Sequence, residues 1–150
     1  MYQILLMKDK ALDEIVFYHI EKMMRTVKEY TVAQFKANGF PVTKDQWVIL
    51  KRIAEINGST QKEIAETTFK DPAALTRILD LLEKKNLVRR QSNAADRRTF
   101  EVHLTVEGSR LVTKMTPVVQ EIRSKAMKNI SKAEEANLKA TLLKMNDNFS

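Results

Sequence analysis

The most constraining feature of this chain is a run of helix and strand signals between Thr60 and Thr105. Thr60 and Glu63 have the capping-box spacing, in which a hydroxyl and a carboxylate each satisfy a free backbone N–H group at the start of a helix. Asp71 and Pro72 mark a second start, because an aspartate caps a helix and proline at its first position loses no hydrogen bond. Two helices separated by a short turn are therefore predicted here.

The second of these helices has two different faces. Large aliphatic residues recur at spacings of three and four, which places them on one side of a helix. They are Leu75, Ile78, Leu79 and Leu82. The other side consists of Ala73, Ala74, Thr76, Arg77, Asp80 and Lys84. We expect the aliphatic face to pack against a core and the opposite face to meet a binding partner.

A basic hairpin follows the second helix. Asn86 suits the left-handed conformation that ends a helix, and residues 87–91 are predicted to form a strand. The segment 99–104 alternates polar and apolar residues, which is typical of a second strand. The loop between them, residues 92–98, is polar and carries two arginines at its descending edge. We interpret this hairpin as a cationic wing.

This order of parts resembles the winged helix-turn-helix of the MarR family, the multiple-antibiotic-resistance family of bacterial transcriptional regulators. The resemblance rests on LTRILDLLEKKNLVRR at 75–90, DRR at 96–98 and VHLTVEG at 102–108. It implies a mainly α fold with a small β-hairpin wing, in which helices from both termini build a dimer. Asn86 departs from the glycine that is usual at this place in the family, but asparagine tolerates the same left-handed conformation.

Signals outside the winged region fit a single unit that spans residues 1–150. We expect an N-terminal dimerisation helix within 1–37, the winged helix-turn-helix at 43–104, and C-terminal dimerisation helices within 105–150. Only three glycines and three prolines occur in the chain. A division into separate domains is therefore not indicated.

The terminal segments carry a surplus of apolar residues. An apolar stripe predicts one long helix over residues 9–36, and a capping box at Ser131 starts a helix that runs almost to the end of the chain. Between them, Thr105 caps a helix in which Pro117 is expected to cause a bend or a one-turn disruption near Thr113. We expect the surplus to form a homodimer interface, and folding back onto the same chain is the alternative.

Composition narrows the class of partner. The 150 residues carry a formal net charge of +7, which favours a polyanion such as nucleic acid or an anionic membrane. No apolar run is long enough to span a membrane and the N-terminal apolar stretch is too short for a signal peptide, so we expect a cytoplasmic protein with no membrane partner. The absence of cysteine excludes disulfides, thiolate metal sites and cysteine-based redox sensing.

Catalytic and metal sites are not indicated. His19 and His103 are far apart in the sequence, and neither belongs to a recognisable catalytic triad. The glycines form no phosphate-cradling loop, and no spacing of histidine and glutamate suggests zinc. We therefore expect neither an enzyme nor a bound cofactor.

Side-chain chemistry indicates how the second helix would read duplex DNA. The N-terminal half of a recognition helix meets base edges in the major groove. We expect Arg77 to bond guanine and Thr76 to meet a phosphate or a thymine methyl group, although an ordinary solvated helix face is the alternative for each. Ala73 and Ala74 are small enough for close approach, and alternatively they are only good helix formers.

In the wing, the resemblance implies that one arginine reaches the adjacent minor groove or its phosphates while Asp96 pairs with an arginine and fixes the loop. Arg97 and Arg98 are the candidates, and the family pattern favours Arg98. A narrow A·T-rich minor groove attracts a guanidinium. We expect Arg89 and Arg90 to divide, one beside DNA and one on the packed side of the strand, with Arg89 as the candidate DNA contact.

These expectations converge on a dimeric, sequence-specific DNA-binding transcriptional regulator that acts on an inverted-repeat operator. Repression relieved by a small aromatic or phenolic effector is what the resemblance implies, and activation stays open. Five residues could line an effector cleft, and the alternative is that they belong to the core. They are Trp47, Tyr18, His19, Met23 and Met115. The alternative function is a winged-helix protein-interaction module whose basic wing meets an acidic protein partner.

Overall fold

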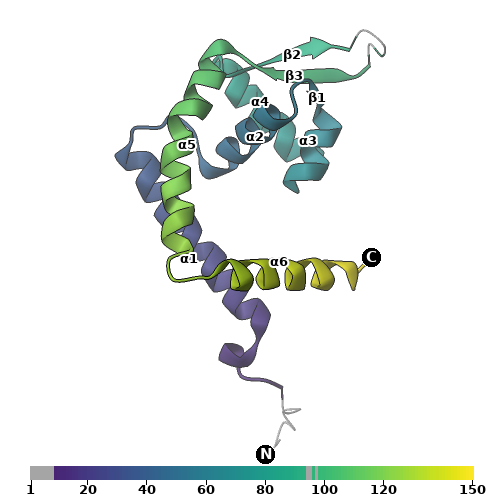
Figure 1. The fold of residues 1–150 in the computed structure, drawn as a ribbon. Helices are drawn as coiled ribbons and strands as arrows, with labels where there is room; N and C mark the ends of the chain where they lie inside the picture. The colour runs from purple at the N-terminus through teal and green to yellow at the C-terminus, as the bar shows by residue number, and fades with distance from the viewer. Residues whose placement is uncertain (1–8, 94–95, 97) are drawn as a thin grey trace, which may run out of the picture.

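The computed structural model of the 150-residue chain describes residues 9–93, 96 and 98–150. The α-helices are α1 (Val16–Ala37), α2 (Lys44–Glu55), α3 (Gln61–Thr68), α4 (Pro72–Lys84), α5 (Val106–Ala126) and α6 (Lys132–Asp147). The strands are β1 (Ser59–Thr60), β2 (Val88–Ser92) and β3 (Phe100–Leu104), which form an antiparallel sheet in the order β1-β3-β2. The prediction of a mainly helical fold with a small β-hairpin wing is confirmed (Figure 1).

Local side-chain contacts set the starts of α2 to α6, and those of α3 to α6 are as predicted. The Asp71 carboxylate accepts a hydrogen bond from the Ala74 N–H at 2.9 Å and begins α4. The Thr105 hydroxyl accepts from the Gly108 N–H at 3.0 Å and begins α5. Complete capping boxes open α2, α3 and α6, at Thr43 with Gln46, Thr60 with Glu63, and Ser131 with Glu134. Each start is therefore determined by residues within one helical turn.

The core lies between α2, α3, α4, the sheet and α5. The predicted aliphatic face of α4 packs into it, since Leu75, Leu79 and Leu82 are buried and Ile78 is partly buried. Val102 of β3 is also fully buried, whereas Phe100 on the same side of that strand is 46% exposed. Phe100 lies towards the wing loop, so only the base of the hairpin contacts the core.

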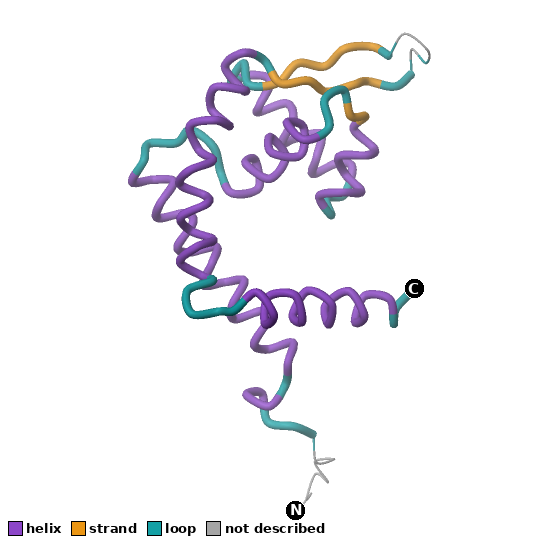
Figure 2. Tube along the Cα trace, in the orientation of Figure 1, coloured by secondary structure: helices purple, strands orange, loops and turns teal. Residues whose placement is uncertain are grey.

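The ends of the chain lie away from the sheet. The three strands gather at one end of the molecule, as Figure 2 shows. The helices α1 and α5 contact each other, and the N-terminal part of α1 extends beyond the end of α5 (Figure 1). Helix α6 leaves that same end and projects from the rest of the chain. None of the described helices is long and apolar enough to cross a membrane.

Two predicted details of the terminal helices do not occur: the early start of the first helix, and the one-turn disruption that was the alternative to a bend in α5. The first long helix begins at Val16 rather than near residue 9, because Ile15 has an extended backbone and a 3-10 turn, η1 (Leu12–Glu14), precedes it. The carbonyl of Asp13 in that turn lies 2.6 Å from the His19 ring. Helix α5 runs through Pro117 without a one-turn disruption. Pro117 is exposed, so water is available to the Thr113 carbonyl that lacks an N–H partner.

No sequence pattern predicted strand β1. Ser59 pairs with Val102 and Thr60 pairs with Glu101, so the residue that caps α3 is also a sheet residue. A two-residue strand is too short to produce an alternating pattern. Its consequence is functional, because β1 attaches the start of α3 directly to the wing.

Candidate nucleic-acid interface

Helix α4 presents the residues that were predicted to read DNA. Thr76 and Arg77 are exposed, as is Ala73, while Ala74 is half-buried. The Thr76 hydroxyl donates to the Pro72 carbonyl at 2.9 Å and accepts from the Gln61 side-chain amide at 3.5 Å, which leaves its methyl group and one oxygen lone pair for a partner. Arg77 forms no ion pair among the residues that the structure describes. This face therefore offers one uncompensated guanidinium beside small side chains.

Asp96 organises the described part of the wing loop. Its carboxylate accepts from the Arg98 backbone N–H at 2.9 Å and from the Thr99 hydroxyl at 3.0 Å. Its own N–H donates to the Asn93 side chain at 3.2 Å. The Arg98 side chain is exposed, and Arg97 lies outside the described residues. Asp96 thus fixes the backbone at Arg98.

A row of polar contacts continues from this loop to the base of the hairpin. The Asn93 amide donates to the Glu101 carboxylate at 2.8 Å, and the other Glu101 oxygen lies 3.3 Å from His103 Nε2. His103 Nδ1 lies 3.1 Å from the Asn57 side-chain oxygen, after the end of α2. The wing is therefore tied along its length to the helical core.

Wing and helices share one surface. A hollow of about 330 Å³ lies between the start of α3 and the wing, and Lys62 and Arg98 both line it.

Glu63 in the first turn of α3 has a pKa below its usual value. The Thr60 backbone N–H, as the larger cause, and the Thr60 hydroxyl both donate to its carboxylate. Of the two strand arginines, Arg89 is exposed and Arg90 is turned towards α4.

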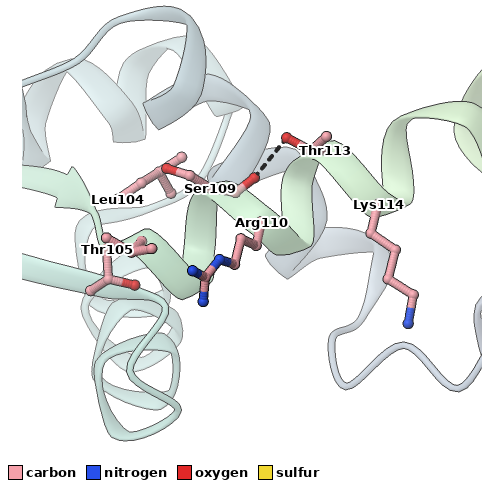
Figure 3. A pocket seen from close by; sticks show the side chains of 7 residues that line it. Leu104, Thr105, Ser109, Arg110, Thr113 and Lys114 are labelled. Carbon is pink, nitrogen blue, oxygen red and sulfur yellow. Dashed lines mark hydrogen bonds between the residues drawn. The ribbon is translucent and has the colours of Figure 1, made fainter.

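Another hollow lies on α5, next to the base of the wing (Figure 3). It has a volume of about 550 Å³, and Arg110 and Lys114 project from α5 beside it. Its remaining lining residues are Leu104, Thr105, Val106, Ser109 and Thr113. The arrangement combines aliphatic surface with two cations, which suits a small organic anion.

The residues that were expected to line an effector cleft are not gathered in one place. Trp47 and Met115 belong to the buried core cluster. Tyr18 and Met23 are exposed on α1, and Tyr18 lines a separate hollow on that helix. Within the described ranges, no group of three or more histidine, aspartate or glutamate side chains is placed to hold a metal.

Comparison with known proteins agrees with this geometry. A sequence profile described as the MarR family matches residues 42–100, from just before α2 to the start of β3. The S. aureus MepR structure, a complex with DNA, is 25% identical and superposes with a TM-score of 0.81 over 93% of this chain and 100% of its own. Residues 42–100 therefore match the MarR family, and the chain has the winged-helix fold of solved MarR structures.

Two further solved structures share this fold. The apo form of MarR from E. coli is 26% identical, with a TM-score of 0.71 over 87% of this chain and 96% of its own. The PcaV transcriptional regulator from Streptomyces coelicolor, in complex with its natural ligand, is 15% identical, with a TM-score of 0.80 over 96% and 100% of the two chains. This chain accordingly has the fold of MarR-type transcriptional regulators, among which the MepR structure is a complex with DNA.

The sequence predicted that one of Arg89 and Arg90 lies on the packed side of the strand, but it did not reveal the partner Gln61. Gln61 and Arg90 are bonded to each other across 29 positions, and both contact α4. The only local signal was the pair of acidic residues Asp80 and Glu83, three apart on the outer face of α4. A pair of carboxylates so placed indicates a cation nearby but does not say which one.

Proposed function

We propose that this chain is a dimeric, sequence-specific repressor that binds an inverted-repeat operator in double-stranded DNA. The proposal rests on Arg77, which is exposed on α4 and has no ion pair among the described residues, beside a wing whose Asp96 holds the backbone of Arg98. In this proposal α4 enters the major groove with Ala73, Ala74, Thr76 and Arg77. Arg98 enters the adjacent minor groove, and Arg89 and Arg97 contact the phosphate backbone of the DNA.

The dimer is proposed from apolar surface that the chain itself leaves uncovered. Helix α6 has no buried residue, and Leu138, Leu143 and Phe149 are 58%, 54% and 85% exposed. The start of α1 likewise exposes Val16 and Phe17. A soluble chain seldom leaves such patches open, so a second copy is the natural cover. Segments 1–37 and 105–150 then serve dimerisation, and 43–104 reads DNA.

The dimer proposal has a direct test. Leu138→Glu with Leu142→Glu places two charges in the proposed interface without touching the winged region. Light scattering should then report the monomer mass, while Lys139→Glu on the same helix, as a matched control, should leave the dimer intact. A dimer that survives the double substitution would mean that α6 is not its interface.

Relief of repression is proposed to act through the hollow on α5. Arg110 and Lys114 supply positive charge, and Leu104 and Val106 supply aliphatic surface, which together suit a small aromatic or phenolic anion. The PcaV complex supports the expectation of a small ligand. Hydroxybenzoates titrated into a protein–duplex complex should release the duplex, and Arg110→Ala should raise the concentration required. Release that is unaffected by Arg110→Ala would move the effector site elsewhere.

Selection of bound sequences from a random duplex pool tests the function itself. The full chain should enrich an inverted repeat, because two identical subunits read two identical half-sites. The alternative is a protein-interaction module for an acidic partner, which would leave the pool unenriched. A regulator of this kind acts where the chromosome is, so we place it in the bacterial cytoplasm.

A further inference from the structure

Arg90 holds three elements together at the DNA-facing end of the molecule. Its Nη2 donates to Asp80 Oδ1 at 2.6 Å and its Nη1 donates to Glu83 Oε2 at 2.7 Å, both on α4. Its Nε donates to Gln61 Oε1 at 3.0 Å, at the start of α3. Its Nη2 also lies 3.4 Å from the Thr76 carbonyl. Arg90 itself belongs to β2, so one side chain joins the wing to both helices.

The donors of Arg90 are nearly all occupied. A guanidinium has five N–H groups, and the contacts to Gln61, Glu83, Asp80 and Thr76 engage four of them. The side chain is 18% exposed, and two carboxylates compensate its charge. A phosphate oxygen would have to compete with both carboxylates for it. Arg90 is therefore not available as a DNA contact, unlike its exposed neighbour Arg89.

The backbone adds a further bond. The Arg90 N–H donates to Glu83 Oε1 at 3.1 Å, so the Glu83 carboxylate holds both the backbone and the side chain of the same residue. Gln61 in turn lies within 3.5 Å of the Thr76 hydroxyl. Thr76 is one of the residues proposed to face DNA. The cluster thus reaches from the wing strand to the reading face of α4.

We propose that Arg90 is a positioning residue that fixes the spacing between the recognition helix and the wing. Arg90 holds α4 and the wing at one distance from each other. The major-groove bases that α4 reads and the minor groove that the wing enters must therefore lie at one matching separation. This inference rests on the proposed DNA-reading function. A planar fork is needed for the task, because a lysine ammonium keeps the charge but lacks the geometry that reaches Gln61, Asp80 and Glu83 together.

Arg90→Lys separates positioning from phosphate contact. A lysine would preserve a phosphate contact, so net charge, non-specific binding and the slope of log affinity against log salt should stay at wild-type values. Affinity for the selected operator should fall about tenfold, the scale of one lost base contact. Arg52→Lys is the matched control, because Arg52 on α2 is ion-paired to Glu55 and is not among the proposed DNA contacts, so this variant should retain operator affinity.

A spacing series gives the readout that loss of stability alone would not move. One base pair is inserted between the element read by α4 and the flanking element read by the wing. Wild-type protein should lose affinity sharply on the inserted duplex, whereas Arg90→Lys should bind the original and the inserted duplexes within about threefold of each other. Gln61→Ala, which removes the bonds to Arg90 and Thr76 but keeps both carboxylate contacts of Arg90, should shift the same ratio in the same direction and guards against a variant that does not fold.

Three outcomes would overturn the inference. Arg90→Lys with an unchanged operator affinity and spacing penalty would do so, and so would Gln61→Ala with an unchanged spacing penalty. The third outcome is that Arg90→Met weakens binding to all duplexes equally and reduces the salt slope by about one, because a lost phosphate contact has these effects. If wild-type protein selects no operator at all, the proposed function fails before these variants are compared.

Discussion

Gly108 should be the least replaceable glycine of this chain. It lies in the first turn of α5, where the helix passes the backbone of Leu87 at the base of the wing. A Cβ at this position would lie 2.0 Å from the Leu87 carbonyl oxygen and 3.0 Å from its carbonyl carbon. That carbonyl oxygen also accepts the Thr105 N–H at 3.1 Å, so it cannot turn away freely.

The expected cost follows from what would have to move. Overpacking of side chains costs about 1 to 3 kcal/mol, and here the obstacle is backbone that is held by a hydrogen bond. We therefore expect Gly108→Ala to destabilise the fold by about 3 kcal/mol, the top of that range. For a chain of this length, about 2 to 4 °C of melting temperature is lost per kcal/mol, which gives a decrease of about 6 to 12 °C.

Gly39→Ala provides the comparison. Gly39 has a φ of 64° and nothing within 4 Å of an added Cβ, so alanine there meets only the left-handed backbone strain of about 1 to 2 kcal/mol. Thermal unfolding followed by circular dichroism at one protein concentration compares the two variants. Gly108→Ala should melt below Gly39→Ala, and the opposite order would refute the argument from backbone contact.

Three further predictions concern the DNA surface and its pH dependence. Arg98→Ala should weaken operator binding by about 1 to 3 kcal/mol in a duplex titration while the melting temperature changes little, and an unchanged affinity would remove Arg98 from the interface. Arg77→Ala should relax base preference at one or two positions per half-site in repeated selections, whereas an equal loss on all sequences would make it a phosphate contact. The folded-state pKa of Glu63 is lowered by its bonds from Thr60, so its stabilisation is present above the unfolded value near 4.5 and is lost as pH falls through the lower folded value. Glu63→Gln should therefore be less stable than wild type at neutral pH and approach it in acid, and a difference that is constant with pH would contradict this assignment.

The sequence predicted what is decided within one helical turn. The starts of α3, α4 and α6 depend on Thr60, Asp71 and Ser131 bonding to N–H groups three residues on, so spacing alone revealed them. The left-handed turn at Asn86 is confirmed by its φ of 55° for the same reason. Patterning also identified the buried face of α4 correctly.

What the sequence did not reveal depends on contacts between distant segments. Strand β1 exists because Ser59 pairs with Val102, and no sequence pattern near Ser59 predicts that pairing. Arg90 and Gln61 are 29 residues apart and acquire their shared role only after folding. The break at Ile15 likewise interrupts an apolar stripe that continues on both sides of it, so periodicity predicted a longer helix than the chain forms.

In the proposed function, two copies of this chain read two half-sites at a fixed separation. Insertion of five base pairs between the half-sites of the selected operator turns one of them by about half a helical turn, since one turn is about 10 base pairs. Equilibrium titration of this duplex should give the affinity of a single half-site, because a dimer with two fixed recognition helices cannot engage both. An affinity equal to that of the uninterrupted operator would contradict the dimeric reading of DNA.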